Sequence, residues 1–172
     1  LTARVKGLHP GLTWEVGPGL HQEHAFVLSP GGRRPLLEVT ELAVSLAPDL
    51  LGWEIHAAKP RKQWDRRLVQ LRSVAATVEI DFDRWRYSLV AWNNYAFFDI
   101  TLIAPATPAL DPDQRLHGAW QLLDGELGER EVLELIGEVR VVTDPEWDWS
   151  HPSGEIPDLH GHIAALRAKR SH

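Results

Sequence analysis

The chain of 172 residues contains no cysteine and no methionine. Without cysteine it can form neither a disulfide framework nor a cysteine-based zinc site, and nothing in its composition calls for an oxidising compartment. We therefore expect a protein of the reducing cytoplasm. Methionine is missing even from position 1, which indicates a trimmed or processed start.

Long apolar runs and a basic excess are also missing. No stretch reaches the roughly 20 apolar residues of a membrane-spanning helix, and the start, LTARVKGLHP, lacks the apolar core of a signal peptide. We predict a soluble protein that binds no membrane. Because 24 acidic and 18 basic residues leave a net charge of −6, we expect no nucleic-acid partner either.

Size and hydrophobic content favour a single domain over residues 1–172. Hydrophobic residues make up 44% of the chain, which is enough for one core, and 172 residues are too few for two typical domains. Short apolar or alternating runs at 12–16 and 25–28, joined by GPGLHQEH, predict a β-hairpin. Alternation over 53–57 predicts a half-buried strand.

Between the hairpin and that strand, Pro35 suits the first turn of a helix. Apolar residues at helical spacing follow it: Leu36, Val39, Leu42, Ala43 and Leu46. Residues 68–105 predict an antiparallel meander, because the runs LVQL, ATVEIDF, RYSLVAW and AFFDITLIA are rich in β-branched and aromatic residues and NNYA supplies a turn. We interpret four tryptophans on predicted apolar faces as core residues: Trp14, Trp53, Trp92 and Trp120.

A second helix is predicted to start at Asp111, which can form a capping box with Gln114. Its buried face would hold Leu116, Trp120, Leu123 and Leu127, and Gly128 would end it. A strand near 138–143, an irregular Trp/Pro-rich loop at 144–155 and a helix near 156–169 follow. The predicted fold class is α+β: a mainly antiparallel sheet, hairpin plus meander, packed by two or three helices.

A basic loop covers residues 59–72 and carries a net charge of +5. Guanidinium groups form bidentate hydrogen bonds, so Arg61, Arg66 and Arg67, with Trp64 among them, are candidates for binding phosphates or an acidic partner. We favour the simpler interpretation, in which the loop pairs with acidic residues of this chain. Residues 79–158 carry a net charge of −12.

Four carboxylates crowd the end of the second helix: Asp124, Glu126, Glu129 and Glu131. The negative end of a helix dipole disfavours each by about 0.3–1 kcal/mol. A cation, a basic partner or Arg130 with the arginine loop would offset this cost. The spacing matches no calcium loop, and we predict no metal site. If the cluster is a partner-binding surface, replacing Glu126 and Glu129 with Gln should raise thermal stability.

No catalytic constellation is visible in the sequence. The pairs His21/His24 and His160/His162 lack the further converging ligands that zinc needs. No serine lies in a glycine-flanked elbow, and no phosphate-cradling glycine loop occurs, so we expect no cofactor. Trp147 and Trp149, beside His151, either line a binding cleft or pin the acidic loop to the protein.

Two segments, PALDPDQRLHGAWQLLDGELGEREVLELIGEVRVV and LAPDLLGWEIHAAKPRK, resemble an uncharacterised bacterial domain family of unknown function. The resemblance covers most of residues 12–143 and centres on LLDGELGE. It implies a single domain and assigns no activity or site residue.

The leading functional hypothesis is a non-catalytic intracellular binding or adaptor protein, of which an immunity-type inhibitor is one form. It would recognise another protein through segregated acidic and basic surfaces, since segregated charge speeds and orients association. The alternative is a metal-dependent hydrolase, in which the Asp124–Glu131 carboxylates and a histidine, such as His117 or His151, hold a cation or shuttle protons. The oligomeric state is open.

Overall fold

The computed structural model describes residues 1–72, 77–106, 110–148 and 150–171. These residues form five α-helices and nine strands in three mostly antiparallel sheets, which confirms the α+β class. The chain divides into two compact units: unit 1 comprises Leu1–Arg61 and Leu127–Glu134, and unit 2 comprises Lys62–Glu126 and Leu135–His172. That the chain forms a single domain stays a prediction.

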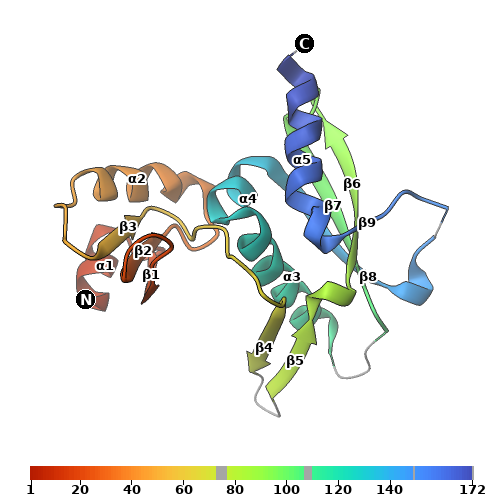
Figure 1. Cartoon of the computed structure of the whole chain (residues 1–172), viewed down its shortest axis with the longest axis horizontal. Coiled ribbons are helices and arrows are strands. Elements are labelled where there is room, and N and C mark those ends of the chain that lie inside the picture. The colour runs from red at the N-terminus through yellow and green to blue at the C-terminus, as the bar shows by residue number, and fades with distance from the viewer. Residues whose placement is uncertain (73–76, 107–109, 149, 172) are drawn as a thin grey trace. The chain divides into compact units, whose positions relative to one another are not determined.

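Unit 1 is built on a three-stranded sheet of order β1–β2–β3 (Figure 1). β1 (Thr13–Pro18) pairs antiparallel with β2 (His24–Ser29), which confirms the hairpin, and β3 (Trp53–His56) pairs parallel with β2. The unit also contains α1 (Thr2–Leu8), which the sequence did not predict, and α2 (Leu37–Ser45). Its core is formed by Val5, Leu12, Leu28 and Leu36.

Helix α2 lies where the sequence predicts it, after a 3-10 turn at Arg34–Leu36, but it buries a different face. Leu36, Leu37 and Thr40 are buried, and Ala43 and Val44 pack against the core. The other members of the predicted stripe, Val39, Leu42 and Leu46, are exposed. Helix α2 carries apolar residues on both sides, so helical spacing alone does not identify the side that packs against the core.

Unit 2 contains a four-stranded sheet of order β8–β7–β6–β9 (Figure 1). β6 (Arg86–Trp92) pairs antiparallel with β7 (Phe97–Ala104), and β8 (Ile136–Thr143) pairs parallel with β7. Asn93, Asn94 and Tyr95 have φ angles of 50°, 53° and 62°, which confirms the tight NNYA turn. β9 (Gly154–Glu155) pairs with the first two residues of β6.

The predicted meander is divided between two sheets. β4 (Leu68–Arg72) and β5 (Thr77–Asp81) form a two-stranded sheet of their own, separate from β6 and β7. A 3-10 turn at Phe82–Arg84 separates them, and the Asp81 side chain caps it by accepting a hydrogen bond from the Asp83 N–H at 3.2 Å. The chain therefore changes direction where the sequence pattern predicts a simple continuation.

Helix α3 (Pro112–Leu127) begins with the predicted capping box: the Gln114 N–H donates to Asp111 Oδ1 at 2.8 Å, and the Asp111 N–H donates to Gln114 Oε1 at 3.1 Å. Gly128, with φ of 83°, follows its last residue. The helix continues almost directly into α4 (Glu129–Leu135). The capping prediction is thus confirmed at both ends.

The buried face of α3 differs from the predicted one by about one residue. Its buried members are Gly118, Ala119, Leu122, Leu123, Gly125, Glu126 and Leu127, whereas Leu116 and Trp120 are exposed. A Cβ atom on Gly118 would lie 3.1 Å from Ile80 Cδ1, so the missing side chain lets β5 approach the helix. Trp92 is also half exposed, so neither it nor Trp120 is the core residue that we predicted.

Helix α5 (Leu159–Ala168) closes the chain as predicted and buries Leu159 and Ile163. The preceding irregular loop contains a 3-10 turn at Asp144–Glu146 and strand β9. Figure 1 shows α5 on one side of the four-stranded sheet and this loop on the other. None of the helices in the described ranges has the length and apolar character of a membrane span.

Candidate functional site

The acidic cluster predicted from the sequence is distributed over both units. Asp124 and Glu126 belong to unit 2, and Glu129 and Glu131 belong to unit 1. Glu126 and Glu129 are 0% and 1% exposed, and Asp124 and Glu131 are partly buried. The two buried carboxylates therefore need partners inside the protein, because an uncompensated buried charge is strongly destabilising.

In unit 2, Glu126 is held by Arg67. Arg67 Nε donates to Glu126 Oε1 at 2.6 Å, and Arg67 Nη1 donates to Asp83 Oδ1 at 3.1 Å. Burial disfavours the charge of Arg67, but the hydrogen bonds with Glu126 and Asp83 outweigh this and raise its pKa above the ordinary value. Arg67 thus connects helix α3 to the turn after β5.

In unit 1, Glu129 is the first residue of α4 and joins three segments. Its Oε1 accepts hydrogen bonds from Ser29 Oγ at 2.8 Å and from the Gly32 N–H at 3.1 Å. Its Oε2 accepts one from the Lys59 N–H at 3.1 Å, and its own N–H donates to the Lys59 carbonyl at 2.9 Å. The Glu129 carboxylate satisfies buried donors, which is a structural task.

The histidines of the hydrolase hypothesis, His117 and His151, contact other residues. His117 is exposed, and its Nε2 lies 2.9 Å from Gln121 Nε2, one turn along α3. His151 lies 3.5 Å from Asp148 in the loop before β9. Over the described part of the chain, no three His, Asp or Glu side chains converge in a way that could hold a metal ion.

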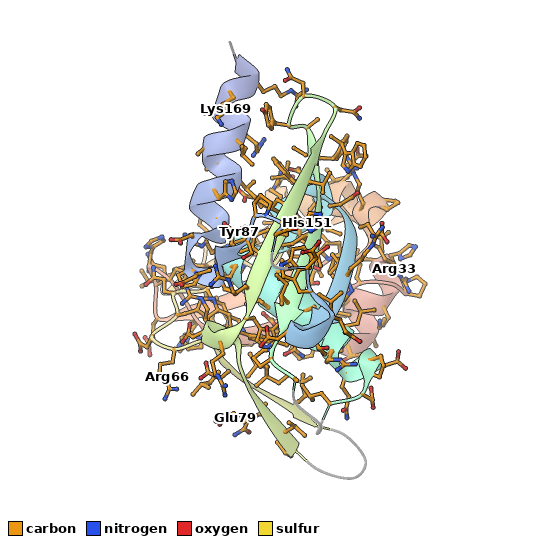
Figure 2. The ribbon with its side chains drawn as sticks, turned by 90° about the vertical axis from the view of Figure 1, so that its right-hand side faces the viewer. Arg33, Arg66, Glu79, Tyr87, His151 and Lys169 are labelled. Atoms are coloured by element: carbon orange, nitrogen blue, oxygen red, sulfur yellow. The ribbon has the colours of Figure 1, made fainter. Side chains whose placement is uncertain are left out.

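The basic loop is largely used inside the protein. Arg67 pairs with Glu126 and Asp83, and Arg66 Nη2 lies 3.7 Å from Asp81 Oδ2 at the surface, where Figure 2 marks it. Lys62 Nζ lies 4.9 Å from the Trp64 ring centre. The loop residues Lys62, Trp64, Arg66 and Arg67 belong to unit 2, whereas Arg61 is an exposed residue of unit 1. Pairing within the chain accounts for Arg66 and Arg67.

Trp64 packs against α3 in unit 2. A Cβ atom on Gly125 would overlap with Trp64 Cζ2, so the indole occupies the space left by the glycine. The Lys62 N–H also donates to the Gly125 carbonyl at 2.8 Å. Trp64 is therefore a packing residue at the start of the basic loop.

The tryptophan loop contains Trp147 and His151, whose ring centres are 5.7 Å apart. Figure 2 shows His151 over the four-stranded sheet, on the face turned to the viewer. The Trp147 Nε1 donor is buried and makes no hydrogen bond with any residue that the structure describes. Trp149, the third residue of this candidate site, lies outside the described residues.

Two further polar contacts were not anticipated from the sequence. Tyr87 Oη lies 2.9 Å from His162 Nδ1, which ties β6 to α5 (Figure 2). In unit 1, the carboxylate of Glu54 accepts hydrogen bonds from the backbone N–H groups of Leu20, His21 and Gln22. The residues in each of these contacts are far apart in sequence, so no local motif predicts them.

Exposed aliphatic side chains gather in unit 1 on α2 and the turn that follows it. We call Val39, Leu42, Leu46, Leu50 and Leu51 the α2 surface. Leu42 and Leu46 are 64% and 77% exposed, and Leu51 is fully exposed. Acidic side chains flank this surface: Glu38 is exposed, Glu41 pairs with Arg130, and Asp49 lies in the turn. The sequence signal for this surface is a helix whose apolar residues are too many to be buried on one side.

A smaller exposed group lies at the end of β6 in unit 2. Val90 and Trp92 are 51% and 52% exposed, and they share one face of the strand. Trp92 Nε1 donates to Asp99 Oδ2 at 2.7 Å, and Asp99 Oδ1 accepts from the Glu138 N–H at 2.8 Å. The exposed indole is therefore held in one orientation.

Comparison with known proteins adds nothing to these surfaces, since no family model, no curated protein and no solved structure matches the chain.

Proposed function

We propose that this chain is a non-catalytic binding protein of the cytoplasm that recognises another protein through the α2 surface. One observation carries the proposal: five large aliphatic side chains are exposed within thirteen residues, on α2 and its following turn. Several exposed aliphatic side chains in one short segment favour an interaction site, because their contact with water is unfavourable.

The charges around the α2 surface define the kind of partner. Glu38 and Asp49 are exposed, and the chain as a whole carries a charge of −6. An acidic rim attracts a partner whose apolar patch is bordered by basic residues, and it repels anionic membrane surfaces. A protein partner with Leu-, Ile- or Phe-rich contacts and flanking Lys or Arg residues therefore fits better than a lipid surface.

The hydrolase alternative has no specific observation in its favour. Glu126 and Glu129 hydrogen-bond to groups within their own units, so their carboxylates already have structural tasks. The same contacts account for these two buried carboxylates without a ligand. Binding through the α2 surface leaves the hydrogen bonds of Glu126 and Glu129 unchanged.

Affinity purification from native cells tests the proposal with a double variant, Leu42→Glu with Leu46→Glu. We expect a discrete co-purifying protein with the wild type and its loss with the double variant, because two buried charges at an apolar contact are costly. The matched control is Leu116→Glu, since Leu116 is 39% exposed on helix α3 of unit 2. Identical recovery with all three proteins would contradict the proposal.

A further inference from the structure

Strand β6 has an open edge over most of its length. β9 pairs only with Arg86 and Tyr87, and the turn to β7 begins at Asn93. Within the described part of the chain, no strand pairs with Ser88–Trp92 on the side away from β7. Ala91 lies on the same face of β6 as Tyr87, whose hydroxyl contacts His162 of α5. Ala91 is exposed, so α5 does not cover this end of the strand.

The backbone geometry identifies which groups face the open edge. The Trp92 carbonyl accepts a hydrogen bond from the Ala96 N–H at 3.0 Å, so it points toward the β7 side. The N–H and C=O groups of successive residues in an antiparallel strand point alternately to its two sides. The groups of Leu89 and Ala91 therefore point outward, and they offer two donors and two acceptors.

The chemistry of this edge differs from that of the edges formed by β1, β3 and β8. Edge strands are commonly protected from pairing by charged residues or proline. β1 carries Glu15 and Pro18, β3 carries Glu54, and β8 carries Glu138 and Arg140. The open segment of β6, SLVAW, has no charge, no proline and no glycine.

We propose that a second copy of this chain covers the open edge, in an antiparallel β6–β6 pair whose two-fold axis passes beside Val90. Copies with a net charge of −6 repel one another, and SLVAW is a segment where no like charges meet. The register follows from what is already occupied: β9 takes the first two residues and the turn follows Trp92, so the centre of the free segment is Val90.

In this pair, Val90 faces Val90 of the second copy in a non-hydrogen-bonded position, where facing side chains are closest. Leu89 faces Ala91 of the second copy, and the two such pairs exchange four backbone hydrogen bonds. Trp92, held by Asp99, lies diagonally across from Val90 of the second copy, within reach of a large side chain. A five-residue seam is smaller than a typical interface of about 1,600 Å², so we expect a concentration-dependent dimer.

Cysteine cross-linking tests the register, and the chain has no cysteine of its own. Facing Cβ atoms in such a pair lie about 4.5–5.5 Å apart, close enough for a disulfide after small adjustment. We expect Val90→Cys to form a covalent dimer under mild oxidation. Val16→Cys is the matched control, because Val16 is also 51% exposed in an edge strand, and it should remain monomeric.

Sedimentation of the unmodified protein over a range of concentrations provides the second test. We expect reversible dimerisation that Val90→Lys weakens by about tenfold or more, because two like charges then face each other. Val16→Lys should leave dimerisation unchanged, as should the double α2-surface variant, so the test is separate from that of the proposed function. The proposal is overturned if the wild type stays monomeric or if Val90→Cys cross-links no faster than Val16→Cys. Either result would also be expected if the edge binds a strand of another protein instead of a second copy.

Discussion

Arg67 and Glu126 form a buried ion pair in unit 2, with Nε and Oε1 2.6 Å apart and the Glu126 side chain fully buried. Removing one member of such a pair leaves the other charge uncompensated, at a typical cost of about 3–5 kcal/mol. We predict that Glu126→Leu lowers the free energy of unfolding by about 3 kcal/mol in a urea titration. The double variant Arg67→Met with Glu126→Leu should recover most of that loss.

The control for this prediction is Glu131→Gln, because Glu131 belongs to the same sequence cluster but is only partly buried. We expect it to change stability by less than about 0.5 kcal/mol. If Glu126→Leu is as mild as Glu131→Gln, the ion pair is not an important part of the fold.

Glu129 should be equally sensitive for a different reason. Its carboxylate accepts from Ser29, Gly32 and Lys59, all of which are donors. In Glu129→Gln the new amide group would turn N–H donors toward them, and leaving buried groups unsatisfied costs about 1–3 kcal/mol. We predict a lower melting temperature by differential scanning calorimetry. The sequence predicts that Gln at 126 and 129 raises stability if the cluster is a partner-binding surface, whereas the buried hydrogen-bond partners predict the opposite.

The Glu54 carboxylate makes unit 1 sensitive to acid. The hydrogen bond from the His21 N–H, with those from Gln22, His56 and Leu20, lowers the pKa of Glu54 from 4.5 to about 2. A lowered pKa contributes stability that is complete above pH 4.5 and is lost as the pH falls toward 2.

This dependence is testable by unfolding the protein at several pH values in that window. We predict that Glu54→Gln is less stable than the wild type above pH 4.5 and that the difference shrinks as the pH falls toward 2. Glu23→Gln is the control, because the Glu23 side chain is 80% exposed in the same hairpin. A wild type and Glu54→Gln that differ equally at every pH would exclude this role for Glu54.

Tyr87 provides a spectroscopic test of the contact between β6 and α5. Burial, together with the negative charge of Asp158, raises the pKa of Tyr87 to about 12. The chain has two tyrosines, so the Tyr95→Phe variant reports Tyr87 alone. We predict an ultraviolet absorption titration with a midpoint near pH 12. A midpoint at the ordinary value of 10 would show that Tyr87 is solvated.

Helix caps and tight turns could be predicted from the sequence, because they depend on interactions between residues that are close in the chain. Asp111 and Gln114 cap α3 as their spacing indicates, and Asn93 and Asn94 adopt the left-handed conformations that a tight turn needs. The face of α3 was harder to predict. Gly118 and Ala119 make its close contacts, and a stripe drawn through large residues such as Leu116 passes over them.

The candidate surfaces depend on long-range contacts that a sequence pattern does not contain. Glu126 and Glu129 look like a solvated acidic group until Arg67 and Ser29, at sequence separations of 59 and 100, are placed beside them. The exposure of the α2 surface could not be predicted from the sequence pattern either. The sequence places Leu42 in a buried stripe, because an apolar residue at helical spacing fits a core and a binding face equally well.

Site-specific photocrosslinking in native cells is the most direct test of protein binding through the α2 surface. A photoreactive amino acid at Leu46 or Leu51 lies within this surface, and one at Leu116 is the control on α3. We predict a discrete adduct of higher mass from positions 46 and 51, containing a protein with an apolar patch bordered by basic residues, and none from position 116. No adduct at 46 and 51, or the same adducts at all three positions, would contradict the account.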